Sequence, residues 1–207
     1  AILLVAAADV VAGVDLGLPE AQIGLMPGAG GVVRVTRLLG MQEAIGLISQ
    51  GARLKADKAL EKGLIHEIAA NEDAMRERAY AWLLANPDAK QPWDREGYKM
   101  PGGGPDHKAN QGLLMLGPVN VMNQTRGLMP AQKAIFAAVA DCARVDFDTA
   151  QKIEARYFLS LLLDQTARNM MIAFFVQMNA ISKGASRPAG IERSKVKTLG
   201  ILGAGQM

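Results

Sequence analysis

One glutamate lies in a segment suited to acid–base chemistry. Glu20 follows Gly17-Leu18-Pro19 and precedes a second glycine-containing turn. Pro19 restricts the backbone just before the carboxyl group, and the apolar residues around it would remove water from it. Desolvation favours the protonated form of a carboxyl group, so such a group can donate and accept a proton near neutral pH. The alternative is a surface glutamate after a proline turn.

The turn that follows is a candidate binding element. Pro27-Gly28-Ala29-Gly30-Gly31 precedes a segment with a helical pattern. Glycines let the backbone come close to a ligand, and the first N–H groups of a helix have no partner inside that helix. We therefore predict that Pro27, Gly28 and Gly30 bind a substrate. A purely structural turn is the alternative.

A third candidate lies near Met207. The apolar segment Val196–Leu202 predicts a strand that runs directly into Gly203-Ala204-Gly205. This order is typical of the start of a dinucleotide-binding fold, in which one glycine makes the tight turn and the next lets the backbone approach the pyrophosphate. Gly203, Gly205 and Met207 are the predicted cofactor-binding residues. A glycine turn after an ordinary strand is the alternative.

Three segments must position these residues. Residues 1–85 alternate between β-branched runs, glycine turns and helical patterns, with helices expected over 32–39, 41–50, 55–62 and 72–84 and a strand over 64–68. Residues 86–194 combine an irregular, proline- and glycine-rich connector, with one short helix before Pro130, and a long helical linker. In that linker Asp146 or Asp148 and then Asp164 are candidate helix caps, and Gly184 ends the helical run. Residues 195–207 form the predicted start of the dinucleotide-binding unit.

The other chemistry-bearing residues favour structural roles. Glu154 and Arg156 fit charges on a helix surface, with contact to substrate as the alternative. His66 and His107 have no second ligand at metal spacing, so no metal site is predicted. Cys142 has no nearby histidine or second cysteine, which indicates a buried thiol.

Composition excludes several classes of protein. The chain has 207 residues, 50% of them hydrophobic and 21% charged, which is enough apolar material for a core and excludes wholesale disorder. A net charge of +3 with interleaved signs argues against nucleic acid, and the apolar run at the start is too short to span a membrane. One cysteine excludes an internal disulfide and suits the cytoplasm. Because the chain begins at Ala1 and stops inside a glycine motif, we expect a piece of a longer protein.

The first segment resembles the enoyl-CoA hydratase (crotonase) family. The resemblance is carried by Gly17-Leu18-Pro19-Glu20, the Pro27–Gly31 turn, the Arg34–Arg37 region and Gly51…Ala59…Gly63-Leu64. It implies an α/β fold, with the C-terminal half of a crotonase-like domain in residues 1–85. It also implies that Glu20 transfers a proton at the α-carbon of an acyl-CoA thioester. The family's second glutamate and an oxyanion-hole glycine would precede Ala1.

The whole order resembles a family of fusion proteins. A crotonase-like half, a helical linker and a Rossmann start occur in this order in α subunits of fatty-acid oxidation complexes, and the linker segments Val145–Ala150 and Gly184–Pro188 extend the likeness. The resemblance implies a lyase and an NAD-dependent oxidoreductase of β-oxidation, which hydrates 2-enoyl-CoA and oxidises 3-hydroxyacyl-CoA, with a thiolase subunit as a partner. The 207-residue piece alone is expected to be inactive. Alternatives are a monofunctional hydratase or isomerase, and a non-catalytic helical adaptor that binds a thiolase.

Overall fold

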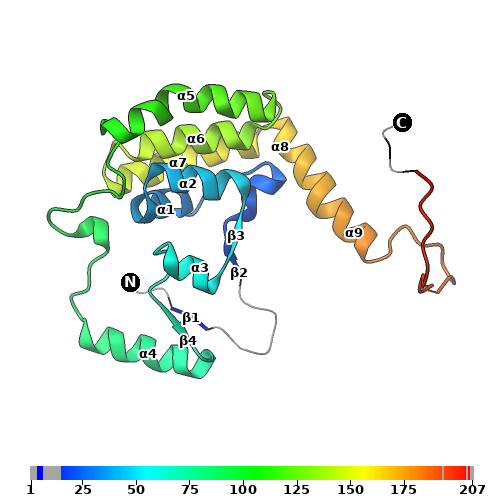
Figure 1. Cartoon of the computed structure of the whole chain (residues 1–207), viewed down its shortest axis with the longest axis horizontal. Coiled ribbons are helices and arrows are strands. Elements are labelled where there is room, and N and C mark those ends of the chain that lie inside the picture. The colour runs from blue at the N-terminus through cyan, green and yellow to red at the C-terminus, as the bar shows by residue number, and fades with distance from the viewer. Residues whose placement is uncertain (1–3, 7–14, 193, 204, 206–207) are drawn as a thin grey trace.

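The computed structural model describes residues 4–6, 15–192, 194–203 and 205. Helices make up most of this part of the chain, and the described strands form two small two-stranded sheets (Figure 1). Strand β1 (Leu4–Ala6) pairs in parallel with β4 (Glu67–Ala69), and β2 (Asp15–Gly17) pairs antiparallel with β3 (Arg53–Lys55). The chain is thus an α/β protein, as predicted. The strand expected over 64–68 lies at 67–69 instead.

The helices of the first segment end within one residue of the predicted positions. A short 3₁₀ helix η1 (Pro19–Ile23) precedes α1 (Gly31–Leu39), α2 (Met41–Gln50), α3 (Ala56–Glu61) and α4 (Glu72–Ala85). Gly51 ends α2 in the left-handed conformation with φ of 59°, which glycine adopts without steric cost. Asn71 caps α4 by accepting a hydrogen bond from the Ala74 amide at 2.8 Å.

The prediction of an irregular connector up to Pro130 is wrong for much of that segment. It contains the 3₁₀ helix η2 (Pro92–Asp94) and the 18-residue helix α5 (Lys108–Thr125), which has Pro118 in its interior. Apolar side chains lie on both the packed and the exposed sides of α5, so the sequence carries no clear helical period there. Packing against α6 stabilises α5 despite the missing backbone N–H of Pro118.

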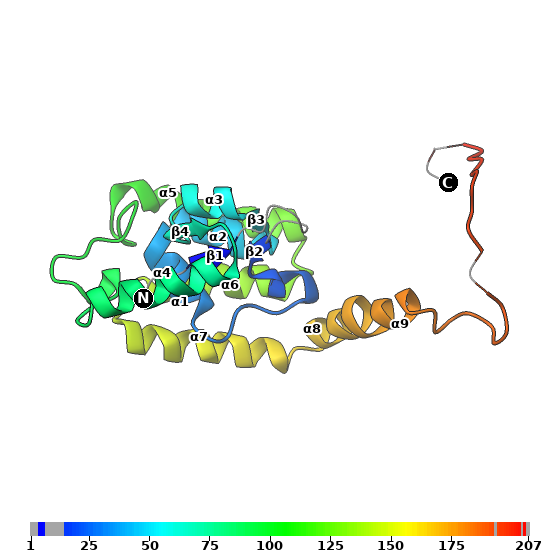
Figure 2. The same cartoon turned by 90° about the horizontal axis from the view of Figure 1, so that it is seen from below.

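The predicted helical linker forms. It contains α6 (Pro130–Cys142), α7 (Phe147–Leu162), α8 (Gln165–Met170), a π-helical turn η3 (Met171–Gln177) and α9 (Met178–Ser182). Asp146 caps α7 by accepting from the Thr149 amide at 2.9 Å, and Asp164 caps α8 by accepting from the Ala167 amide at 3.0 Å. Figure 2 shows α7 running along one side of the molecule beside α1, with α8 and α9 extending beyond it.

One hydrophobic core joins the first segment to the linker. Fully buried side chains from both meet in it, among them Met26, Val32 and Ile48 from the first segment and Ile135 and Val139 from α6. Leu161 of α7 completes the cluster. Side chains from both sides of residue 85 thus pack in one core. The predicted domain boundary at residue 85 stays a prediction.

The strand predicted over Val196–Leu202 is absent from the described residues 194–203. These residues have no regular secondary structure, and Val196 and Leu202 are 72% and 104% exposed (Figure 1). A strand needs neighbouring strands to pair with its N–H and C=O groups, and no described strand borders this segment. Met207 lies outside the described residues. Within the described part of the chain, no helix is long and apolar enough to cross a membrane.

The contact between α5 and α6 provides a test of the fold. A Cβ atom added at Gly117 would overlap the ring of Phe136, whereas one added at Gly112 on the same helix would meet no atom within 4 Å. We expect Gly117→Ala to lower the free energy of unfolding by about 1–3 kcal/mol through overpacking. Gly112→Ala should raise it by roughly 0.5–1 kcal/mol through helix propensity. Denaturant unfolding measures both, and equal effects of the two variants would contradict the packing of α5 described here.

Candidate active site

Glu20 lies in η1 with its side chain partly exposed. Its Oε2 atom is nevertheless buried and has no hydrogen-bond partner among the described residues. Buried polar atoms in folded proteins are nearly always paired, and a catalytic role is one of the explanations for an exception. Thr36, Ser49 and Gln132 also have such an atom. A buried, unpaired carboxyl oxygen is able to exchange a proton with a bound ligand without first breaking a bond to the protein.

Two hydrogen bonds hold the 3₁₀ helix η1, which carries Glu20. The carbonyl oxygen of Glu20 accepts a hydrogen bond from the Leu25 amide at 3.0 Å, which closes the turn after η1. The Gln22 side-chain amide donates to the carbonyl of Gly51, at the end of α2, at 3.1 Å. These bonds fix η1 to a helix end that is itself part of the core, so the position of Glu20 is defined by the packed part of the molecule.

The predicted glycine turn leads into the N-terminus of α1, where a carboxylate from a distant helix occupies the first amides. The Gly30 amide donates to Glu154 Oε1 at 2.6 Å, and the Val33 amide donates to Glu154 Oε2 at 2.9 Å. Gly30 itself has φ of 86°, and α1 has no side-chain cap of its own at that position. Glu154 therefore caps α1 from α7, far away in sequence.

The prediction that Glu154 is a helix-surface charge is wrong. Its side chain is 1% exposed, among the most buried polar groups in the described part of the chain. Burial raises the pKa of the Glu154 carboxyl group, while the hydrogen bonds from the Val33 and Gly30 amides and the charge of Arg34 lower it. The sequence pattern of α7 could not show this, because both hydrogen-bond partners lie more than 100 residues earlier. Arg156, by contrast, is exposed as predicted.

Helices α7 and α8 also cover the other glycines of the segment. A Cβ atom on Gly28 would lie 2.5 Å from the ring of Phe158, and one on Gly24 would lie 2.9 Å from the Cα atom of Ala167. Both distances are far below van der Waals contact. Because Gly24 and Gly28 have no side chain, α7 and α8 can pack closely against this turn. The sequence did not indicate this contact. Substrate binding by Pro27, Gly28 and Gly30 remains a prediction.

The remaining sequence candidates lie apart from Glu20 in the sequence and take structural roles. Cys142 is fully buried, as predicted, and its thiol donates to the Ala150 carbonyl at 3.3 Å. Burial raises its pKa to about 12, so the reactive thiolate is disfavoured. His107 accepts from the Ala109 amide at 3.3 Å at the start of α5. Within the described ranges, no group of three or more His, Cys, Asp or Glu residues could hold a metal ion.

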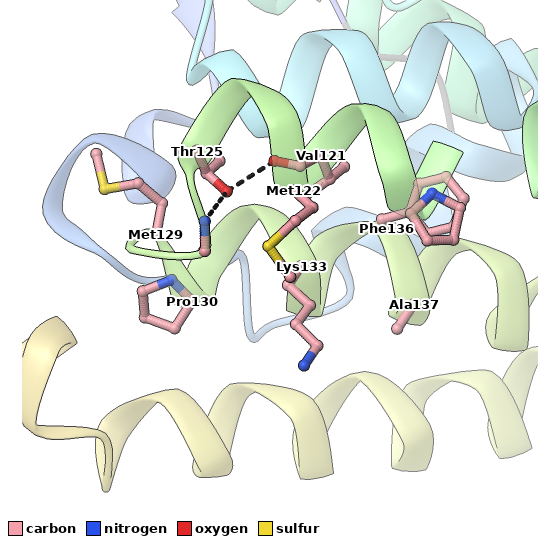
Figure 3. Close-up of a pocket in the computed structure, with 10 residues that line it drawn as sticks. Val121, Met122, Thr125, Met129, Pro130, Lys133, Phe136 and Ala137 are labelled. Atoms are coloured by element: carbon pink, nitrogen blue, oxygen red, sulfur yellow. Dashed lines mark hydrogen bonds between the residues drawn. The ribbon is translucent and has the colours of Figure 1, made fainter. Parts of the chain in front are cut away.

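An apolar cavity of about 400 Å³ lies between α5 and α6, a feature that the sequence did not indicate (Figure 3). Met122, Met129 and Phe136 contribute to its wall. Its polar side includes Thr125, whose hydroxyl donates to the Val121 carbonyl at 2.7 Å, and Lys133. The sequence did not indicate this cavity, because only one short helix was expected before Pro130, whereas α5 has 18 residues.

The described residues around Gly203 do not by themselves form a nucleotide site. Gly203 has φ of 84°, which suits a glycine in a tight turn, but a Cβ atom there would meet no atom within 4 Å. A dinucleotide site needs a paired strand before the turn and a helix after it. Neither is present among the described residues, so Gly203 and Gly205 remain predicted cofactor-binding residues.

The sequence is similar to one protein family and to two known proteins. Residues 2–90 match the enoyl-CoA hydratase/isomerase family. Over 92% of its length the chain is 28% identical to the fatty acid oxidation complex subunit alpha of Vibrio campbellii, and 29% identical to that of Vibrio parahaemolyticus. The chain spans about 27% of the length of these relatives.

Two solved structures resemble the chain at lower sequence identity. Carnitinyl-CoA hydratase from Mycobacterium avium is 20% identical with a TM-score of 0.49, over 85% of this chain and 52% of that one. Enoyl-CoA hydratase subunit I from Geobacillus kaustophilus is 24% identical with a TM-score of 0.33, over 84% and 51%. Residues 2–90 are thus similar to an enoyl-CoA hydratase/isomerase domain, and over 92% of its length the chain is similar to fatty acid oxidation complex alpha subunits.

Proposed function

We propose that this chain supplies the α-carbon acid–base group of a 2-enoyl-CoA hydratase, and that Glu20 is that group. The observation that carries the proposal is the buried, unpaired Oε2 atom of Glu20. The family match over residues 2–90 supports the reaction class, and the acyl-CoA thioester as substrate fits that family.

The proposed reaction adds water across the double bond of a trans-2-enoyl-CoA. The water oxygen bonds to the β-carbon, the electron pair of the double bond moves toward the thioester, and a proton returns to the α-carbon. Glu20 gives that proton in hydration and removes it in the reverse direction, so its carboxyl group alternates between acid and carboxylate. The negative charge on the thioester oxygen requires backbone donors. By the family resemblance, those donors and the glutamate that works on water would come from residues before Ala1.

The longer protein is proposed to oxidise the product. The alpha-subunit relatives extend well beyond the part that this chain matches, and Gly203, Gly205 and Met207 fit the opening of a dinucleotide site by their spacing. A 3-hydroxyacyl-CoA dehydrogenase that uses NAD, assembly with a thiolase subunit and a cytoplasmic location follow as parts of this proposal. The sequence likeness of the helical linker to these relatives favours it over a monofunctional hydratase.

The first prediction from the proposed function concerns Glu20. In the natural full-length protein, Glu20→Gln should lower the kcat of enoyl-CoA hydration by about 10²–10⁴-fold, because the amide cannot exchange the proton. Glu77→Gln, at an exposed position on α4, is the matched control and should retain wild-type activity. Spectrophotometric assay of a four-carbon 2-enoyl-CoA measures both.

Retained hydration in the Glu20→Gln variant would refute the assignment of Glu20. A wild-type protein that folds and binds a thiolase but hydrates no enoyl-CoA would instead favour the non-catalytic adaptor.

The second prediction concerns the coding sequence beyond Met207. A dinucleotide-binding unit requires a third glycine or a small residue directly after this position, and an acidic residue about twenty positions further on for the ribose hydroxyls. Sequencing of the gene past this point tests the requirement directly. A continuation with neither feature would leave the hydratase proposal intact and remove the NAD-dependent dehydrogenase.

A further inference from the structure

The buried carboxylate of Glu154 is the best-defined polar group that the proposed chemistry does not use. Both of its oxygens accept hydrogen bonds from backbone amides, Gly30 at 2.6 Å and Val33 at 2.9 Å, and its side chain is 1% exposed. A carboxylate in this state has no exposed edge to offer a substrate. Any influence on chemistry must therefore act through the backbone that it binds.

That backbone leads directly to Glu20. Gly30 is separated from Leu25 by a short turn, and the Leu25 amide donates to the Glu20 carbonyl at 3.0 Å. Leu25 and Met26 are buried in the core, so the turn has little freedom at its beginning. Its other end is fixed at the N-terminus of α1, where Glu154 supplies the cap that α1 lacks. The position of Glu20 relative to α1 thus depends on both anchors.

Helix α7 contacts the turn at a second point. Phe158 lies one helical turn after Glu154, and its ring covers Gly28 so closely that a Cβ atom there would be 2.5 Å away. Because Glu154 and Phe158 share a face of α7, the helix approaches the turn at two adjacent places. Two contacts from one rigid helix restrict rotation of the turn as well as its translation.

We propose that Glu154 is a positioning residue for the acid–base chemistry of Glu20. Through the hydrogen bonds of Glu154, α7 holds the glycine turn in a fixed position relative to Glu20. This inference rests on the proposed function. Loss of one oxygen acceptor would leave a backbone N–H of α1 buried and unpaired, and the turn would shift to satisfy it. A displacement of about 1 Å at a reacting group can cost on the order of 10²-fold in rate.

The test compares Glu154→Gln with Asp148→Asn in the full-length protein. Glutamine keeps the shape of the side chain but turns an NH₂ group toward one of the two N–H donors, whereas Asp148 is an exposed carboxylate on the first turn of the same helix. We expect kcat for hydration of a four-carbon 2-enoyl-CoA to fall by about 10–100-fold in Glu154→Gln, with KM within about threefold of wild type. Asp148→Asn should change neither constant.

Two outcomes contradict the positioning role. One is a kcat for Glu154→Gln equal to that of the control, and the other is a raised KM with unchanged kcat, which would indicate a part in substrate binding. If Glu154→Gln does not fold, Glu154→Asp, which keeps the charge and shortens the reach, carries the same test with the same criteria. A wild-type protein without hydratase activity would contradict the proposed function itself.

Hydrogen exchange gives a readout independent of activity. Mass spectrometry of the peptide around residues 27–35 should show faster exchange in Glu154→Gln than in Asp148→Asn, because one of the Gly30 and Val33 amides loses its acceptor. Unchanged exchange in this peptide would show that the carboxylate does not hold the turn.

Discussion

A carboxylate from one helix caps the start of another, and the candidate site depends on this interaction. The first amides of a helix have no partner inside it, and α1 begins at a glycine that offers no side chain to satisfy them. Glu154 of α7 accepts hydrogen bonds from two of them, the amides of Gly30 and Val33. Hydrogen bonds to a charged acceptor are stronger than neutral ones, and burial increases the cost of breaking them. The contact therefore ties the linker to the segment that carries Glu20.

The packing of α7 and α8 against the first segment explains why glycine stands at two positions of that segment. Gly28 faces the Phe158 ring and Gly24 faces the backbone of α8, so a methyl group at either position would force the helices away. A glycine-rich turn is commonly interpreted as a cradle for a ligand. Here the contacts of Gly24 and Gly28 are helix–turn contacts, and the amides of Gly30 and Val33 are already bonded to Glu154. Substrate binding by this turn stays a prediction.

Local signals were sufficient for much of the fold. Gly51 ends α2, and Asp146 and Asp164 cap α7 and α8, because each of these devices acts within one helical turn of its position in the sequence. Only one short helix was predicted where the 18-residue α5 lies, because the apolar residues there show no clear helical period and the stability of α5 comes from packing on α6. The strand expected at Val196–Leu202 did not form in the described residues, since strand pairing also requires non-local partners.

The sequence also suggested one part of the candidate site, Glu20, and not the other, Glu154. The residues around Glu20 made it a candidate and the family resemblance implied its role, which stays a prediction; the structure adds that its Oε2 atom is buried. The role of Glu154 was not accessible from the sequence, because a glutamate on an amphipathic helix has the same local pattern whether it faces water or a distant helix terminus. Only the fold places its carboxylate beside Gly30 and Val33.

The central claim is that Glu20, held by this packing, meets the α-carbon of an enoyl thioester. A crystal structure of the full-length protein with a bound, unreactive acyl-CoA analogue tests it most directly. The account predicts a Glu20 carboxyl oxygen within about 3–3.5 Å of the α-carbon, with the Glu154 bonds to Gly30 and Val33 intact. An analogue bound with its α-carbon far from Glu20, for example in the cavity between α5 and α6, would contradict it.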